Sequence, residues 1–227
     1  MGRYYFDNVS PAYLRIRDEL REAEIALMEQ RERVAELRRS LPREEAIPED
    51  YVLREGPRDL GAGDAPVVER KLSEFFDDPA KPLVLLHFMF GGAQESPCPM
   101  CTLWADGYDN LVPHLEQRVN FAVVVAGDVA TFRAYARERG WRHVRILSSE
   151  GSSLKRDLFF EEADGSQWPG VSIFERDAEG RVHHFYSGGA RLSPEHFRGM
   201  DLLSPFWSFL DLTPDGRGDF MPKKSYA

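Results

Sequence analysis

The stretch that decides the fold is LVLLHFMFGGAQESPCPMC, residues 83–101. Its first half, 83–90, is an almost continuous apolar run, and such a run predicts a buried strand covered on both faces. The stretch ends in Cys98 and Cys101, which are the only two cysteines of the chain. The residues after them have a helical pattern. We therefore expect a strand, a loop, and a cysteine pair in the first turn of a helix.

The Cys-x-x-Cys spacing predicts dithiol–disulfide chemistry. Two intervening residues bring both sulfurs to the first turn, where they can close or open a small disulfide ring. The N-terminal end of a helix favours negative charge and so stabilises a thiolate. Pro99 is tolerated at a first helical position, and it keeps Cys98 out of the helical region. We predict that Cys98 is the exposed, low-pKa nucleophile and Cys101 the more buried resolving thiol.

A metal site and a structurally inert pair are the alternatives for these cysteines. Zinc is held by about four ligands. The six histidines of the chain include no His-x3–5-His pair, and there is no second cysteine pair. A metal at this position would need ligands from distant segments, so no metal or other bound cofactor is expected.

Composition favours a folded protein that binds neither nucleic acid nor a membrane. The chain has 227 residues, 42% of them hydrophobic, and a formal net charge of −9. That negative charge disfavours nonspecific binding to nucleic acid or to anionic lipid. No apolar run approaches the roughly 20 residues of a membrane span, and the first residues lack a signal-peptide core. We expect a cytoplasmic protein.

A long helix is predicted at the N-terminus, from Ser10-Pro11 to about Leu41. Ser10 is a suitable N-cap, and a proline follows it in the first turn. The helix carries an apolar stripe at alternating spacings of three and four, interrupted only by a glutamine. The stripe consists of Tyr13, Ile16, Leu20, Ala23, Leu27, Gln30, Val34, Leu37 and Leu41. It can pack on its own domain or pair with a second copy in a homodimer, and both alternatives stay open.

We divide the chain into a helical extension (1–42), a connector (43–66), a main domain (67–212) and a polar tail (213–227). Strands are predicted at 51–53, 83–90, 121–126, 144–148, 171–175 and 182–186. Helices are predicted at 67–77, from the cysteine pair to about 117, at 128–139, after Ser152 or Ser153, and at about 194–210. Strands alternating with helices and followed by a hairpin predict an α/β fold with a central mixed sheet flanked by helices.

This order of elements resembles the thioredoxin fold, in the version found in peroxiredoxins. More closely, the chain resembles an uncharacterised bacterial thioredoxin-like family catalogued as domain of unknown function 899. The segments that carry the resemblance are 86–91, 98–101, 104–106, 140–142, 148–152, 170–177 and 210–214. The resemblance implies a thioredoxin-like fold and redox-active cysteines.

The resemblance also points to Pro169. Thioredoxins carry a cis proline just before the strand that faces the cysteine pair, and Pro169 stands at the matching position. It is the third candidate site residue beside Cys98 and Cys101. We predict a cis Trp168–Pro169 bond, because proline is the only residue that adopts cis at low cost.

The chain departs from both related families around the first cysteine. Ser96-Pro97 stands where thioredoxins usually have a tryptophan, after a longer and flexible loop (91–95), so substrate docking should differ. Peroxiredoxins place Thr or Ser three residues before the peroxide-attacking cysteine, where this chain has Glu95. Their partner arginine aligns with Val171. A peroxiredoxin-type peroxidase is therefore less favoured.

The sequence thus predicts a thiol–disulfide oxidoreductase that needs no bound cofactor. Its substrate is a protein or small-molecule disulfide, and its electrons come from another dithiol carrier or a low-molecular-weight thiol. The alternatives are a non-catalytic module that binds or dimerises through the long helix, and a dithiol metal binder. His87 can assist proton transfer or be a core residue, Glu95 can raise the pKa of Cys98 or be a solvated acid, and Trp104 is expected in the core.

Overall fold

The computed structural model describes residues 4–43 and 45–226. The chain divides into two units, Met1–Pro42 and Arg43–Ala227, and each is described by itself. In the described part of the chain, no helix combines the length and the apolarity that crossing a bilayer requires.

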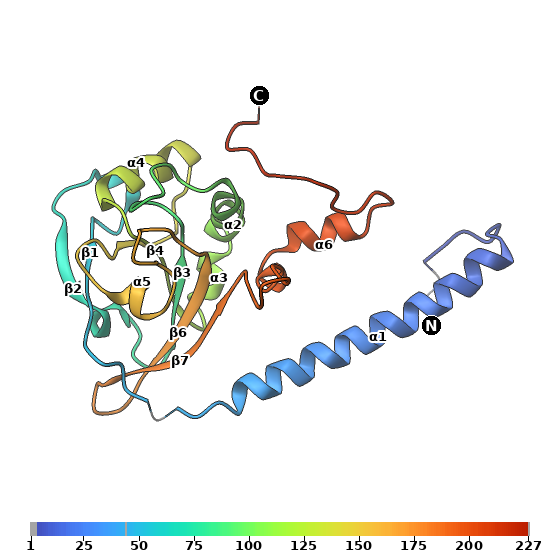
Figure 1. Ribbon diagram of the computed structural model, residues 1–227, viewed down its shortest axis with the longest axis horizontal. Coiled ribbons are helices and arrows are strands. Elements are labelled where there is room, and N and C mark those ends of the chain that lie inside the picture. Colours follow the sequence, from blue (N-terminus) through green and yellow to red (C-terminus); the bar gives the residue numbers. More distant parts are fainter. Residues whose placement is uncertain (1–3, 44, 227) are drawn as a thin grey trace. The chain divides into compact units, whose positions relative to one another are not determined.

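The first unit consists mainly of the helix α1, Pro11–Arg39 (Figure 1). The hydroxyl of Ser10 accepts a 3.1 Å hydrogen bond from the backbone N–H of Tyr13, so Ser10 caps the helix as its sequence predicts. None of the described α1 residues is buried. Leu20 and Leu27 of the apolar stripe are 48% and 60% exposed. That this helix pairs with a second copy stays a prediction.

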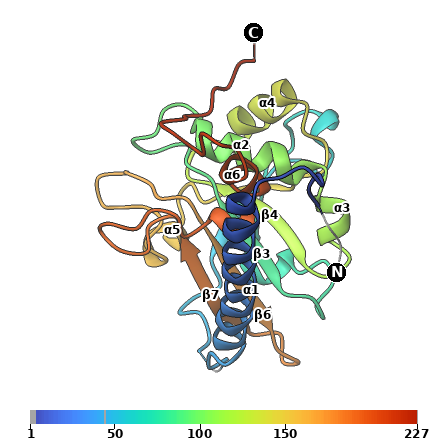
Figure 2. The same ribbon diagram turned by 90° about the vertical axis from the view of Figure 1, so that its right-hand side faces the viewer.

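The second unit is built on a seven-stranded sheet in the order β2-β1-β5-β4-β3-β6-β7. The strands are β1 (Val52–Glu55), β2 (Val68–Lys71), β3 (Leu83–His87), β4 (Asn120–Val125), β5 (Ile146–Ser148), β6 (Gly170–Arg176) and β7 (Val182–Gly189). The central strands β3, β4 and β5 are parallel, and β1, β2, β6 and β7 join in antiparallel pairs. The long hairpin β6–β7 forms one edge of the sheet (Figures 1 and 2).

Two hydrophobic cores lie on the two faces of this sheet, because successive side chains of a strand point to opposite faces. In β4, Val123 and Val125 belong to one core, whereas Ala122 and Val124 belong to the other. The first core is covered by α2 (Pro99–Asp109), α3 (Val112–Leu115) and α4 (Val129–Arg139). The second is covered by α5 (Leu154–Asp157) and by the 3₁₀ turn Leu72–Phe75. The predicted mixed sheet flanked by helices is therefore confirmed.

The helix predicted at 67–77 is wrong. These residues form β2 and a 3₁₀ turn instead. Strand β2 pairs with β1, which lies inside the segment expected to be a connector. Leu72 and Phe75 are fully buried, and their spacing of three suits a 3₁₀ turn as well as an α-helix. The apolar pattern alone did not separate the two.

Two further helices are shorter than predicted, and proline accounts for both. The helix after the cysteine pair ends at Asp109, and α3 with Pro113 follows as a separate turn. The helix expected over 194–210 is reduced to a 3₁₀ turn, Asp201–Leu203, and α6 (Pro205–Asp211). A proline removes a backbone donor and clashes with the preceding turn, so it starts a helix but does not continue one.

Candidate redox site at the start of helix α2

The cysteine pair is brought back against the end of β3. Beyond β3 the chain stays extended, and Phe88 N–H donates to Val124 O at 2.9 Å. After a turn, the Cys98 N–H donates to Met89 O at 3.2 Å. This bond fixes the first cysteine beside the strand that precedes it. The predicted order of strand, loop and cysteine pair is thus a compact unit in space.

The loop between them, expected to be flexible, is held by backbone hydrogen bonds. Gly91 and Gln94 exchange two bonds of 2.8 and 3.0 Å, and Ala93 N–H donates to Gly165 O at 3.0 Å. Gly91 has a φ of +91°, and a Cβ there would lie 2.1 Å from the backbone nitrogen of Gly127. Only glycine fits this close approach.

The two cysteines occupy the positions that their spacing predicts. Cys98 is the N-cap of α2 with φ −64° and ψ 129°, and Pro99 is the first residue of the helix. The Cys98 carbonyl accepts 2.9 Å hydrogen bonds from both the backbone N–H and the hydroxyl of Thr102. Both cysteines are free thiols; Cys98 is half-buried, and Cys101 is 1% exposed.

The helix start moves the two thiol pKa values in opposite directions. A hydrogen bond from Cys101, helped by the backbone N–H groups of Cys101 and Met100, lowers the pKa of Cys98 from 9.0 to about 6. The same hydrogen bond, together with burial, raises the pKa of Cys101 well above its ordinary value. Cys98 is therefore the thiolate at neutral pH, and Cys101 keeps its proton.

The C-terminal tail contributes a positive charge near Cys98, which no sequence pattern predicted. Lys224 acts on Cys98 and lowers its pKa further. The tail is attached through Arg139 of α4, which donates to Lys224 O at 2.5 Å and to the Tyr226 hydroxyl at 2.7 Å. The Tyr226 hydroxyl donates in turn to Asp106 of α2 at 3.0 Å. The polar tail therefore reaches helix α2.

The predicted cis Trp168–Pro169 bond is wrong: among the described residues, the cis bond is Ala65–Pro66. Trp168 N–H donates to Phe160 O at 3.0 Å, and Pro169 O accepts from Ala190 N–H at 3.3 Å. The bond to Ala190 thus extends the pairing of β6 with β7 by one residue to Pro169, and the bond before this proline is trans, the form favoured by about 0.5–1 kcal/mol. Because β6 pairs Gly170 with His87, Pro169 still lies at the end of β3 from which the cysteine loop leaves. Its role at the site stays a prediction.

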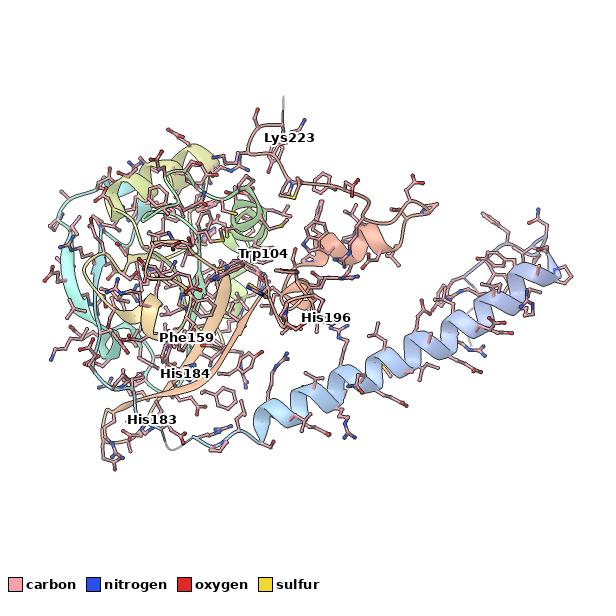
Figure 3. All side chains as sticks on the ribbon, viewed as in Figure 1. Trp104, Phe159, His183, His184, His196 and Lys223 are labelled. Carbon is pink, nitrogen blue, oxygen red and sulfur yellow. The ribbon has the colours of Figure 1, made fainter. Side chains whose placement is uncertain are left out.

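The other candidate residues belong to the scaffold. His87 is fully buried, its Nε2 is 2.9 Å from Ser172 Oγ, and its ring stacks on Phe160 with centroids 3.9 Å apart. Burial lowers its pKa well below the ordinary value, so it is neutral. Trp104 is 4% exposed and belongs to a hydrophobic core, as predicted (Figure 3). Across residues 4–43 and 45–226, no group of three or more His, Cys, Asp or Glu side chains is placed to hold a metal ion.

The comparisons with known proteins agree on the fold. The family model described as "Bacterial protein of unknown function (DUF899)" matches residues 7–226. The 1-Cys peroxiredoxin called antioxidant protein of Plasmodium falciparum is 13% identical with a TM-score of 0.51, covering 74% of this chain and 99% of its own. A further structure, titled only as a peroxiredoxin, is 12% identical with a TM-score of 0.50, covering 73% and 98%. The comparison with curated proteins gave no match. At these identities the likeness shows a peroxiredoxin-like thioredoxin fold.

Proposed function

The chain belongs to the DUF899 family, and from that premise we propose that it is a thiol–disulfide oxidoreductase whose redox centre is the pair Cys98 and Cys101. One observation carries the proposal. The shared hydrogen bond at the start of α2 makes one thiol acidic and keeps the other protonated. That division of roles is the one that exchange through a mixed disulfide requires.

The geometry supports a two-step reaction. The Cys98 thiolate attacks one sulfur of a substrate disulfide, and the other sulfur leaves as a thiolate that takes up a proton. Cys101 then loses its proton and attacks Cys98, so that the Cys98–Cys101 bond forms and the bond to the substrate breaks. The substrate disulfide is reduced by two electrons, and the cysteine pair is oxidised. A second dithiol carrier or a low-molecular-weight thiol restores the pair.

Pro169 and the N-terminal helix complete the proposal. Pro169 lies at the end of β3 from which the cysteine loop leaves, and we propose it as a contact for the substrate, which is a protein or small-molecule disulfide. The exposed heptad stripe of α1 is the contact for a second copy of the chain, since heptad spacing is the pattern of two-helix coiled coils. The binding-module and metal-binding alternatives lack a comparable supporting observation.

A peroxidase reaction is not proposed. The similar structures are peroxiredoxins, but likeness of fold at 12–13% identity does not carry an activity. Glu95 stands three residues before Cys98, where peroxiredoxins have a hydroxyl residue.

The deciding experiment is a redox titration of the pair in glutathione buffers, followed by the mass shift on alkylation. We expect a reversible two-electron transition between about −180 and −270 mV, the range of exchange proteins. Cys98→Ser should abolish exchange, whereas Cys101→Ser should accumulate the mixed disulfide with substrate. Normal turnover of Cys98→Ser, or a pair that never closes, would overturn the proposal.

A further inference from the structure

Lys155 of α5 is a buried cation that donates hydrogen bonds to two neutral oxygen atoms. Its side chain is fully buried. The ammonium Nζ donates to Phe88 O at 3.0 Å and to Gln167 Oε1 at 2.7 Å. Gln167 is in turn anchored, because its amide nitrogen donates to Gly91 O in the loop before the cysteines. The ammonium is thus held in one place directly behind the redox loop.

A lysine in this position is costly to maintain. Removing an ammonium from water is unfavourable unless an opposite charge compensates, and carbonyl oxygens compensate only in part. Burial accordingly lowers the pKa of Lys155 from 10.5 to about 8. The largest opposing influence is the negative charge that Cys101 carries when it is a thiolate, and Glu161 adds a smaller one. The buried cation therefore favours the thiolate form of Cys101 and lowers the pKa of this thiol.

A single peptide group connects the two. The carbonyl oxygen of the Phe88–Met89 peptide accepts from Lys155. The N–H of the same peptide, that of Met89, is a hydrogen-bond donor to the Cys101 sulfur and lowers its pKa. A cation on the carbonyl side polarises the peptide and strengthens its N–H as a donor, because hydrogen bonds in a chain reinforce one another. Lys155 thus acts on Cys101 both through space and through this peptide.

The remaining titratable groups around this arrangement are few. Cys98 of α2 faces Cys101 and raises its pKa through their hydrogen bond. His87 of β3 lies within range of Lys155, but burial keeps it neutral. Glu161 follows α5, and its carboxylate oxygen lies 3.9 Å from the Arg156 guanidinium, with which it forms an ion pair. Among the residues that the structure describes, Lys155 is therefore the cation that lowers the pKa of the Cys101 thiol.

We infer that Lys155 is a positioning residue for the second step of exchange. Its ammonium group stabilises the thiolate of Cys101 through the Phe88–Met89 peptide. This inference rests on the proposed function. Once Cys98 is joined to the substrate, it no longer accepts the hydrogen bond of Cys101. The proton of Cys101 must then leave, and the negative charge that develops on its sulfur faces a fixed cation. The thiolate attacks Cys98, and the bond between Cys98 and the substrate sulfur breaks.

The test measures Cys101 alone, in the Cys98→Ser background. The rate of Cys101 alkylation is measured against pH in the protein with the native Lys155 and in the Lys155→Met variant. The methionine keeps the length of the side chain and removes its charge. At a fixed pH below the midpoint we expect Lys155→Met to slow alkylation about tenfold and to move the profile to higher pH. Lys155→Arg keeps the charge and should retain most of the rate. Lys71→Met, at an exposed position of β2, is the matched control.

A second measurement keeps the native lysine. In Cys98→Ser, the ¹⁵N shift of the Met89 amide should titrate together with the Cys101 thiol. An unchanged alkylation profile in Lys155→Met, or a Met89 amide that does not follow Cys101, would overturn the inference. The proposed function fails separately, by absence of exchange in the unmodified chain.

Discussion

Cys101 donates a hydrogen bond to Cys98 across the first turn of α2, and this one bond is the largest influence on the pKa of both thiols. The two cysteines are three residues apart, yet one is half-buried and the other is almost fully buried. The difference follows from the helix, whose first turn leaves Cys98 at the rim and turns Cys101 toward the core. Two residues of the same type in the sequence thus differ in burial and in thiol pKa in the folded protein.

The pH dependence of Cys98 reactivity tests this bond. Because its pKa is lowered to about 6, the thiolate predominates above that pH and is lost as the pH falls through it. Cys101→Ser keeps a hydroxyl donor, whereas Cys101→Ala removes the donor. We expect the alkylation profile of Cys98 to move to higher pH in Cys101→Ala relative to Cys101→Ser. Coincident profiles in the two variants would show that the hydrogen bond does not set the reactivity.

The C-terminal tail should tune the same thiol. Replacing Lys224 by Ala removes a positive charge that lowers the pKa of Cys98, so alkylation of Cys98 at a pH below its midpoint should slow by about two- to threefold. Salt should reduce the difference, because it screens a partly exposed charge. Lys223→Ala serves as the control, since Lys223 is the neighbouring residue but is not among the groups that shift the pKa of Cys98. Equal rates in both variants would contradict a role for the tail.

Tyr226 is expected to hold the tail in place. Its hydroxyl connects Arg139 of α4 with Asp106 of α2. Tyr226→Phe removes both hydrogen bonds and keeps the ring. We expect it to reproduce the slowed Cys98 alkylation of Lys224→Ala in part, with no measurable change in the thermal unfolding midpoint. An unaltered alkylation rate would indicate that the tail is held by other contacts.

The turn before the cysteines should tolerate no side chain at Gly91. Gly91→Ala would place a Cβ 2.1 Å from the Gly127 backbone at a φ of +91°, and we expect a loss of about 3 kcal/mol or more in the free energy of unfolding. Gly140→Ala is the control, because Gly140 has a similar φ of +80° with nothing within 4 Å. That variant should cost about 1 kcal/mol. Denaturant unfolding of the two variants separates the steric contact from the backbone strain, and equal losses would refute the close approach.

The heptad stripe of α1 is tested by a pair of matched substitutions. Leu27 lies in the stripe and Met28 lies outside it, and both are 60% exposed. In sedimentation equilibrium we expect Leu27→Glu to weaken dimerisation at least about tenfold, because a carboxylate in a coiled-coil core is strongly disfavoured. Met28→Glu should have little effect. A wild-type protein that stays monomeric at all concentrations would disprove the predicted homodimer.

Much of the fold was predictable because its central elements carry strong local patterns. The apolar runs at 83–90 and 121–126 correspond to β3 and β4, and the Ser10 and Asp128 caps begin α1 and α4 as expected. Edge elements were less predictable. Residues 67–77 have an apolar spacing that suits two structures, and pairing with β1 decided between them.

The sequence by itself determined the chemistry of the site: two cysteines, their spacing, and a proline that makes the first of them an N-cap. These depend on neighbouring residues and on local backbone preferences. The tertiary structure alone decided what surrounds the pair. Three residues around the pair are distant from the cysteines along the chain: Lys155, Pro169 and Lys224. Their contribution depends on which charges and backbone groups the folded sheet and its helices bring into range. Electrostatic interaction depends on distance in space and on burial, and neither can be read from distance along the sequence.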